Sequence, residues 1–278
     1  MDVILLGTGS PLPNPHRAGP ATLVRSGATN LLIDCGRGVA LRLAAAGVAQ
    51  PSLSAVLLTH MHSDHITDLN DIITGYWVLG APAGPLRIYG PKGAKALVAA
   101  TLAMLAFDVK YRIDHHDDLN AGPEVETTEL EPGDTFTVGG CRISAHRTDH
   151  SPVFPTLGYR IEAEGVVAAL AGDTVPCREL DEMCRGADVY VQTVIRDDLV
   201  RRVPVQRLQD ILDYHSTVEQ AAQTAARAGV KTLMLTHYVP ALVPGQEEEW
   251  RAIARPHFAG EIALGDDLTG VSIQAAAQ

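Results

Sequence analysis

The stretch Thr59-His60-Met61-His62-Ser63-Asp64-His65 follows directly on the apolar run 55–58, which is typical of a buried strand. Imidazole and carboxylate groups are ligands that Zn²⁺, Mn²⁺ and Fe²⁺ accept. On an extended backbone His60 and His62 point to the same side, so they can hold one ion. Asp64 and His65 follow at once and can turn toward a second ion. A polar loop whose histidines only cap turns would explain one or two of these residues but not four, so the stretch predicts a metal-binding loop.

The composition fits a globular protein and argues against a broad nucleic-acid-binding surface. The chain has 278 residues, 46% of them hydrophobic, and a net charge of -11. Such a charge argues against a broad electrostatic surface for nucleic acid, although a local basic pocket is compatible with it. The N-terminus lacks the features of a signal peptide, and no apolar run reaches the length of a membrane span. We therefore expect a cytoplasmic protein without a membrane partner, whose cysteines are reduced thiols: Cys35, Cys141, Cys177 and Cys184.

Strands and helices are expected to alternate along the chain, with a strand-rich middle. The patterns predict strands at residues 2–6, 21–25, 30–34, 55–58, 86–89, 124–130, 135–138, 141–146, 156–162, 166–171, 187–193 and 231–235. They predict helices at residues 39–46, 66–79, 92–106, 177–185, 201–214, 216–228 and 247–254. Two packed sheets with helices outside both of them are the economical architecture.

Three further polar residues stand where predicted strands end. His150 follows the strand through Ile143, Asp173 follows the apolar run 166–171, and His237 follows residues 231–235. Rigid elements can hold a ligand in place, so these residues are candidates to complete a two-metal site. Taken singly, each also fits an ordinary turn, cap or core role. A second polar cluster, residues 115–118, lies in an unpatterned stretch and is expected to be a solvated turn.

The order of these residues resembles the metallo-β-lactamase superfamily. Within it, three further segments are similar to the branch that holds ribonuclease Z and the zinc-dependent arylsulfatases: Leu6-Gly7-Thr8-Gly9-Ser10, Gly158-Tyr159-Arg160 and His215-Ser216-Thr217. The likeness covers nearly the whole chain. It implies an α/β fold, the αβ/βα four-layer sandwich, as one hydrolase domain over residues 1–278, and it implies a site for two metal ions.

By matching positions, the resemblance implies two ligand sets joined by a bridging carboxylate. The first set is His60, His62 and His150, the second is Asp64, His65 and His237, and the bridge is Asp173. The ions would be divalent, with Zn²⁺ expected and Mn²⁺ or Fe²⁺ as alternatives. Two bridged ions can lower the pKa of a shared water molecule from 15.7 to about 7, which supplies hydroxide for ester hydrolysis. The same ions can stabilise an anionic oxygen of the substrate.

Asp64 and His215 are the expected catalytic residues. His215 stands just before the sequence Ser216-Thr217-Val218-Glu219, which has the form of a capping box and places a helix N-terminus beside it. Backbone N–H groups there favour an anion, so the hypothesis is that His215 donates a proton to the leaving group or a hydrogen bond to the developing oxyanion. The helix dipole disfavours imidazolium and therefore favours the hydrogen-bond version. The alternative is a histidine that only packs at the helix start.

The chain departs from the ribonuclease Z pattern at two places. Ribonuclease Z carries a glutamate that partners this histidine, whereas Thr193 stands in the aligned stretch. Ribonuclease Z of the bacterial type also inserts a long arm that grips transfer RNA, whereas only residues 161–171 separate the two flanking motifs here. This shortness argues against a substrate as large as transfer RNA. Arg196, together with Arg201 and Arg202, is expected to pair with adjacent aspartates instead of reading a phosphate.

We therefore expect a ribonuclease Z-like phosphodiesterase that acts on a small-molecule ester, in the first place a small phosphodiester. The alternatives are an arylsulfatase-like sulfohydrolase, a transfer RNA 3′-processing endonuclease, and a lactonase or other esterase. A non-catalytic metal-binding protein is a further alternative, because the glutamate partner of His215 is missing. Relatives of this branch suggest a homodimer.

Overall fold

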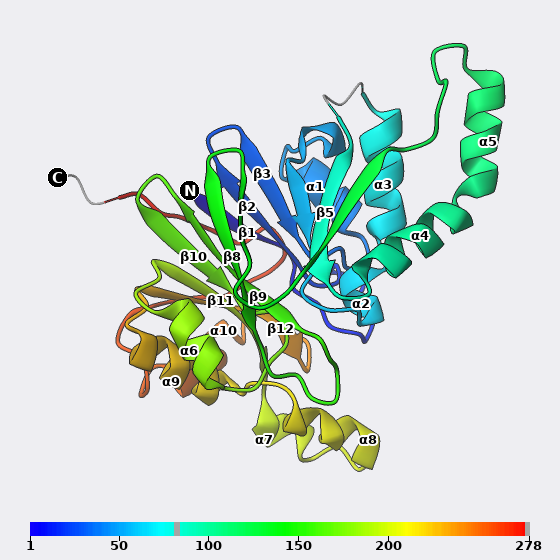
Figure 1. The fold of residues 1–278 in the computed structure, drawn as a ribbon. Helices are drawn as coiled ribbons and strands as arrows, with labels where there is room; N and C mark the ends of the chain where they lie inside the picture. Colours follow the sequence, from blue (N-terminus) through cyan, green and yellow to red (C-terminus); the bar gives the residue numbers. More distant parts are fainter. Residues whose placement is uncertain (81–83, 276–278) are drawn as a thin grey trace.

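Two seven-stranded sheets form the middle of the molecule in the computed structural model, which describes residues 1–80 and 84–275 (Figure 1). The first sheet has the strand order β14-β1-β2-β3-β4-β5-β6, and the second has the order β13-β12-β11-β10-β9-β8-β7. The strands of the first sheet are β1 (Asp2–Gly7), β2 (Ala21–Ser26), β3 (Thr29–Ile33), β4 (Ala55–Leu57), β5 (Leu86–Pro91), β6 (Val125–Leu130) and β14 (Gly270–Ser272). Those of the second are β7 (Thr135–Val138), β8 (Cys141–Arg147), β9 (Leu157–Ala163), β10 (Val166–Leu170), β11 (Val189–Ile195), β12 (Thr232–Val239) and β13 (Glu261–Ala263).

Helices cover the outer face of each sheet, which gives four layers (Figure 1). The first sheet carries α1 (Val39–Ala45), α3 (Leu69–Val78) and α4 (Ala94–Met104), and α5 (Ala106–His115) projects beyond them. The second carries α6 (Arg178–Cys184), α9 (Val218–Ala228) and α10 (Glu247–Ala254). The short elements are α2 (Ser63–Ile66), α7 (Asp197–Val200), α8 (Gln206–Gln209) and the 3₁₀ turns η1 (Gln50–Ser52) and η2 (Asp210–Asp213). None of the described helices is long and apolar enough to span a membrane.

Three groups of buried apolar side chains hold the layers together. One lies between the sheets and joins residues such as Leu57 of β4 to Leu170 of β10. The others fill the spaces between each sheet and its own helices, as Leu43 of α1 does on one side and Trp250 of α10 on the other. Strands β4 and β11 are buried along their whole length, as strands with both faces covered must be. The predicted α/β four-layer sandwich is confirmed.

Several local predictions are wrong in instructive ways. Residues 201–214, predicted as one helix, are broken into α8, η2 and connecting turns, because this polar stretch has few residues that face the core. The capping box lies one residue later than predicted: Thr217 accepts from the Gln220 N–H, and the Gln220 side chain accepts from the Thr217 N–H. Helix α5 and the short strands β13 and β14 were not predicted.

The sheet topology brings the predicted site together. Strands β3 to β6 run parallel to one another, and so do β10 to β13. The carboxyl ends of parallel strands meet at one edge of each sheet, and the candidate residues lie at these ends, after β4 in the first sheet and after β10 and near the end of β12 in the second. Strand β12 continues through His237, whereas the sequence pattern predicted its end at residue 235. The pairing of β11 with β12 is irregular in this part of the strand, between Thr193 and Ile195.

Candidate metal centre

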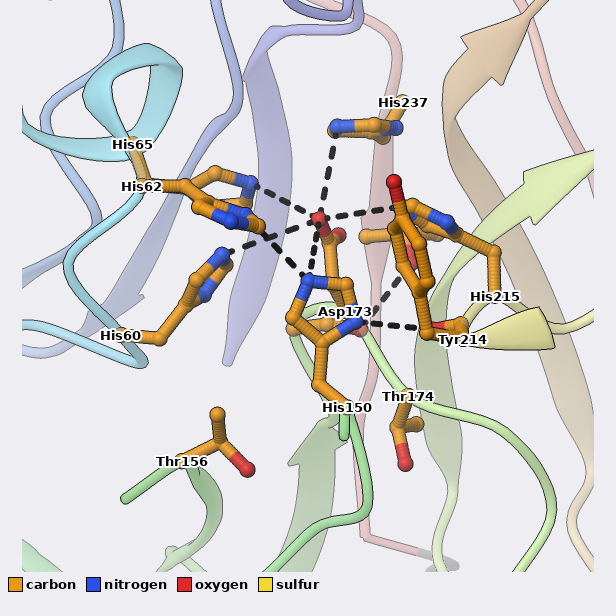
Figure 2. A network of polar contacts seen from close by, with 12 residues as sticks. His60, His62, His65, His150, Thr156, Asp173, Thr174, Tyr214, His215 and His237 are labelled. Carbon is orange, nitrogen blue, oxygen red and sulfur yellow. Dashed lines mark hydrogen bonds and ion pairs between the residues drawn. The ribbon is translucent and has the colours of Figure 1, made fainter. Parts of the chain in front are cut away.

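Seven side chains converge at the edge where the two sheets meet. Figure 2 labels all of them except Asp64. The first half of the chain supplies four of them from the segment after β4: His60, His62, Asp64 and His65. The second half supplies His150 from the β8–β9 connection, Asp173 from the segment after β10, and His237 from β12. All seven predicted ligand residues are therefore within one site, whereas the exposed cluster at residues 115–118 is not part of it.

One group of donor atoms consists of His60, His62, His150 and Asp173, all within 4.8 Å of one another. The His62 Nδ1 and His150 Nε2 atoms face each other at 3.3 Å. Asp173 Oδ2 lies 3.8 Å from the Nε2 atoms of both His60 and His150. Ligands bound to a tetrahedral zinc at its usual Zn–N distance are about 3.3–3.4 Å apart, so the spacing of this group is close to that of a coordination shell.

A second group consists of Asp64, His65 and His237, again within 4.8 Å of one another. Asp64 Oδ2 lies 3.2 Å from His237 Nε2 and 3.7 Å from His65 Nε2. Asp173 Oδ2 is 3.3 Å from His65 Nε2 and 3.6 Å from His237 Nε2. The same carboxylate thus adjoins both groups. The two groups have the members that the resemblance implies, and ligation itself stays a prediction.

The unpaired atoms at the centre fit divalent metal ions. Among the described residues, His60 Nε2, His65 Nε2 and Asp173 Oδ1 are buried without a hydrogen-bond partner. Burying a polar atom unpaired costs about 1–3 kcal/mol, so three such atoms in one place call for a ligand. Neutral imidazole and carboxylate together are a donor set for zinc and similar divalent ions.

Outer hydrogen bonds fix which nitrogen of His60, His65 and His150 faces the centre. Asp34 Oδ2 accepts from His65 Nδ1 at 2.7 Å, and Asp34 also accepts from the Thr59 hydroxyl at 2.8 Å. That hydroxyl lies 3.0 Å from His60 Nδ1, so it is the acceptor there. The Tyr214 carbonyl accepts from His150 Nδ1 at 2.7 Å. These three rings are thereby oriented with a lone pair on Nε2, the form that binds a metal.

Asp34 is a site residue that the sequence analysis missed. Its backbone has φ 62°, a left-handed conformation that Asp tolerates better than most residues, and this aims the carboxylate at both His65 and Thr59. The signal was present but weak: Asp34 ends a buried strand, as Asp173 follows one.

The histidines of the two groups differ in their electrostatics. Burial lowers the pKa of His60 well below its ordinary value, lowers the pKa of His62, and lowers the pKa of His150 to about 4. Burial also acts to lower the pKa of His65 and His237. Nearby carboxylates outweigh it and raise both pKa values, Asp173 being the largest contributor at each. In the absence of metal, the histidines of the first group therefore favour the neutral form, and those of the second group favour the protonated form.

His215 lies beside the two groups. Its Nε2 atom is 3.3 Å from Asp173 Oδ2, and its Nδ1 atom donates to the Ile211 carbonyl at 3.0 Å. A carbonyl partner orients the ring but supplies no charge. Thr193, which stands in place of the glutamate, donates to the Gly172 carbonyl instead of contacting His215. Arg196 binds Asp198 through two hydrogen bonds, as predicted.

Comparisons with known proteins agree on one family. The family model described as the beta-lactamase superfamily domain matches residues 29–238. The chain is 56% identical over 277 residues to a protein named ribonuclease Z from Mycolicibacterium paratuberculosis, and the match covers 99% of each chain. It is 52% identical over 275 residues to ribonuclease Z of Mycobacterium tuberculosis, with 98% of each chain covered.

Solved structures show the same fold at lower identity. The metallo-beta-lactamase fold protein YhfI from Bacillus subtilis superimposes with a TM-score of 0.76 at 21% identity, covering 97% of this chain and 98% of the other. Human tRNase Z, short form, superimposes with a TM-score of 0.73 at 22% identity, covering 99% and 100%.

Proposed function

The chain belongs to the ribonuclease Z family of the metallo-β-lactamase superfamily and is a metal-dependent, phosphodiester-cleaving hydrolase, and on that premise we propose that its substrate is a precursor transfer RNA. The observation that carries the proposal is the centre itself: seven convergent ligand residues on a chain that matches proteins named ribonuclease Z from end to end. Human tRNase Z, whose name states its substrate, shares the fold.

The comparisons do not support the expected small-molecule ester as substrate. That expectation depended on the short hairpin formed by β9 and β10, which turns at Glu164 and Gly165. The relatives named ribonuclease Z are about as long as this chain, since the match covers 99% of both. A chain of this length is therefore compatible with an RNA substrate.

We propose that two divalent ions, in the first place Zn²⁺, bind at the centre. One ion would be held by His60, His62 and His150, and the other by Asp64, His65 and His237. Asp173 would contact both ions. The donor atoms of each set lie within 4.8 Å of one another. When bound, such ions act as Lewis acids that activate water and stabilise the anionic oxygens of a phosphodiester.

The protein side chains supply orientation and hydrogen bonding around that centre. Asp34 and the Tyr214 carbonyl hold the ligand rings in the required tautomers. Asp64 is proposed as a catalytic residue that places a carboxylate beside the reacting phosphate. His215, whose Nε2 atom lies next to the Asp173 carboxylate, is proposed to hydrogen-bond the phosphate or its leaving oxygen. Its Nδ1 atom donates to the Ile211 carbonyl, so Nε2 can donate this hydrogen bond only when the ring carries both protons.

A parallel assay tests the substrate. The zinc-loaded protein is given precursor transfer RNA, a bis-aryl phosphate and an aryl sulfate, with metal-stripped protein as the control. We expect cleavage of the RNA at a single position, slower hydrolysis of the bis-aryl phosphate, and no release of sulfate. Hydrolysis of the bis-aryl phosphate without any RNA cleavage would contradict the RNA proposal and restore a small substrate.

We also propose that the described residues act as one domain, because a shared apolar core joins the two sheets. A single unfolding transition by circular dichroism and by tryptophan fluorescence is expected. A cytoplasmic location and a homodimer stay predictions of the resemblance.

A further inference from the structure

The connection between β8 and β9 holds both a metal-ligand residue and an exposed aromatic side chain. Its two ends are tied together by Thr148 and Thr156, whose hydroxyls lie 2.9 Å apart, and the Thr156 hydroxyl also donates to the Thr148 carbonyl. Its middle is tied to the segment after β10, because the Val175 N–H donates to the Asp149 carbonyl at 2.8 Å. The loop is therefore a fixed support at the edge of the centre.

Phe154 projects from this loop into solvent with 76% of its surface exposed. Arg147, the last residue of β8, holds its guanidinium carbon 5.9 Å from the centre of the Phe154 ring. Within the described residues, Arg147 makes no ion pair, so its charge is available on a chain with a net charge of -11. The nearby Asp149 carboxylate accepts a hydrogen bond from the Ser151 N–H inside the loop.

The turn geometry places Phe154 close to the candidate ligand His150. The Val153 N–H donates to the His150 carbonyl at 2.9 Å, which closes a four-residue turn. The Cα atoms of such a turn are less than about 7 Å apart, and Phe154 is one residue further along. The Phe154 Cα therefore lies no more than about 11 Å from the His150 Cα.

We propose that Phe154 and Arg147 form a stacking platform for an unpaired base of the RNA next to the cleaved phosphate. The ring would stack on the base, and the Arg147 guanidinium would bind the flanking phosphate. An exposed aromatic ring beside a lone cation is the combination that binds single-stranded nucleic acid without reading its sequence. This inference rests on the proposed RNA substrate and adds the subsite that grips its single strand.

Fluorescence of a labelled RNA tests the platform directly. The probe is a short stem RNA with a single-stranded 3′ extension, in which 2-aminopurine replaces the unpaired base beside the cleavage position and a phosphorothioate slows cleavage. Binding to the zinc-loaded wild type is expected to quench the fluorescence, because the analogue stacks on Phe154. In the Phe154→Ala variant the quenching is lost and binding weakens about 5- to 150-fold, the range for one lost base–aromatic stack. Phe154→Trp is expected to restore both.

Three measurements keep the outcomes distinct. Phe107→Ala is the matched control, because Phe107 is a similarly exposed phenylalanine, 74% exposed, on α5. This variant is expected to bind RNA as the wild type does. Metal content and hydrolysis of bis-aryl phosphate should be unchanged in all variants. Quenching that survives in Phe154→Ala would overturn the inference. A lower molar mass for Phe154→Ala than for the wild type by light scattering would also overturn it, because it would mean that a second copy of the chain covers the ring in the wild type. Failure of the wild type to bind the probe at all would instead contradict the proposed RNA substrate.

Discussion

The two sheets contribute to the metal centre in opposite ways. The first sheet delivers four of the proposed ligand residues from one continuous segment, which begins at His60 and ends in the short helix α2. The second sheet delivers single residues from three separate places, His150, Asp173 and His237. The first contribution is local and compact, whereas the second exists only because the fold brings distant strand ends together. The centre is therefore a product of the packing of both sheets.

The backbone of the second sheet is also bent where it supplies ligands. His237 has φ 51° and lies where the β11–β12 pairing is irregular, a place where a bulge can re-aim a side chain. Gly172 has φ 65°, and a Cβ there would lie 2.9 Å from the Thr59 Cβ. A glycine is needed at this position, because the segment before Asp173 approaches the loop of the first sheet too closely for a side chain.

The largest effect should come from removing the residue that both groups share. Asp173→Asn keeps the shape of the side chain but removes the charge next to five imidazole rings. We expect loss of at least one ion and a fall in kcat/KM of at least about 10³-fold, because several kcal/mol of transition-state stabilisation depend on the metals. Elemental analysis and RNA cleavage measure the two effects. Asp118→Asn is the control, and wild-type metal content in Asp173→Asn would refute the bridging role.

An intermediate effect should come from Asp34, which supports the first-sheet loop from behind. In Asp34→Asn the side chain keeps one acceptor oxygen, so its NH₂ group must face either the Thr59 N–H or the Thr59 hydroxyl and His65 Nδ1, and those bonds are lost. We expect metal affinity or activity to fall about 10- to 100-fold, the usual effect of losing an outer partner of a metal-bound histidine. Competition with a zinc chelator measures the affinity. Asn also tolerates the left-handed backbone, so the melting temperature with bound zinc should change little.

Titration of the metal-free protein should separate the two ligand groups. His150 is expected to stay neutral until the pH falls to about 4, because its burial opposes the charged form. His65 and His237 should instead remain protonated above the ordinary histidine pKa, because Asp173 and neighbouring carboxylates favour their charged forms. Since protons compete with metal, the second group should lose its ion first as the pH falls. Histidine NMR signals followed against pH test this order, and a common titration of all rings would contradict it.

The contrast between the sheets also explains what could be predicted from the sequence. The loop from His60 to His65 could be predicted as a metal-binding segment because its candidate ligands are close together in the sequence and follow a strand that is apolar throughout. Asp173 and His237 became convincing only through their order in the chain and the resemblance it carries. Asp34 escaped notice because nothing local distinguishes a carboxylate that orients a histidine from one that ends a strand. The broken helices near residue 205 escaped because their positions are set by solvent exposure, which periodicity does not encode.

The smallest effect tests a local detail of the second sheet, the start of α9 beside His215. The structure places the capping box at Thr217 and Gln220, whereas the sequence pattern favoured Ser216 and Glu219. Thr217→Ala removes the hydroxyl that accepts from the Gln220 N–H and should lower the free energy of unfolding by about 1 kcal/mol. Glu219→Ala leaves the cap intact and should cost only a few tenths of a kcal/mol. Urea denaturation of the two variants decides between the two positions of the capping box. If the box were formed by Ser216 and Glu219, Glu219→Ala would lower the free energy of unfolding more than Thr217→Ala.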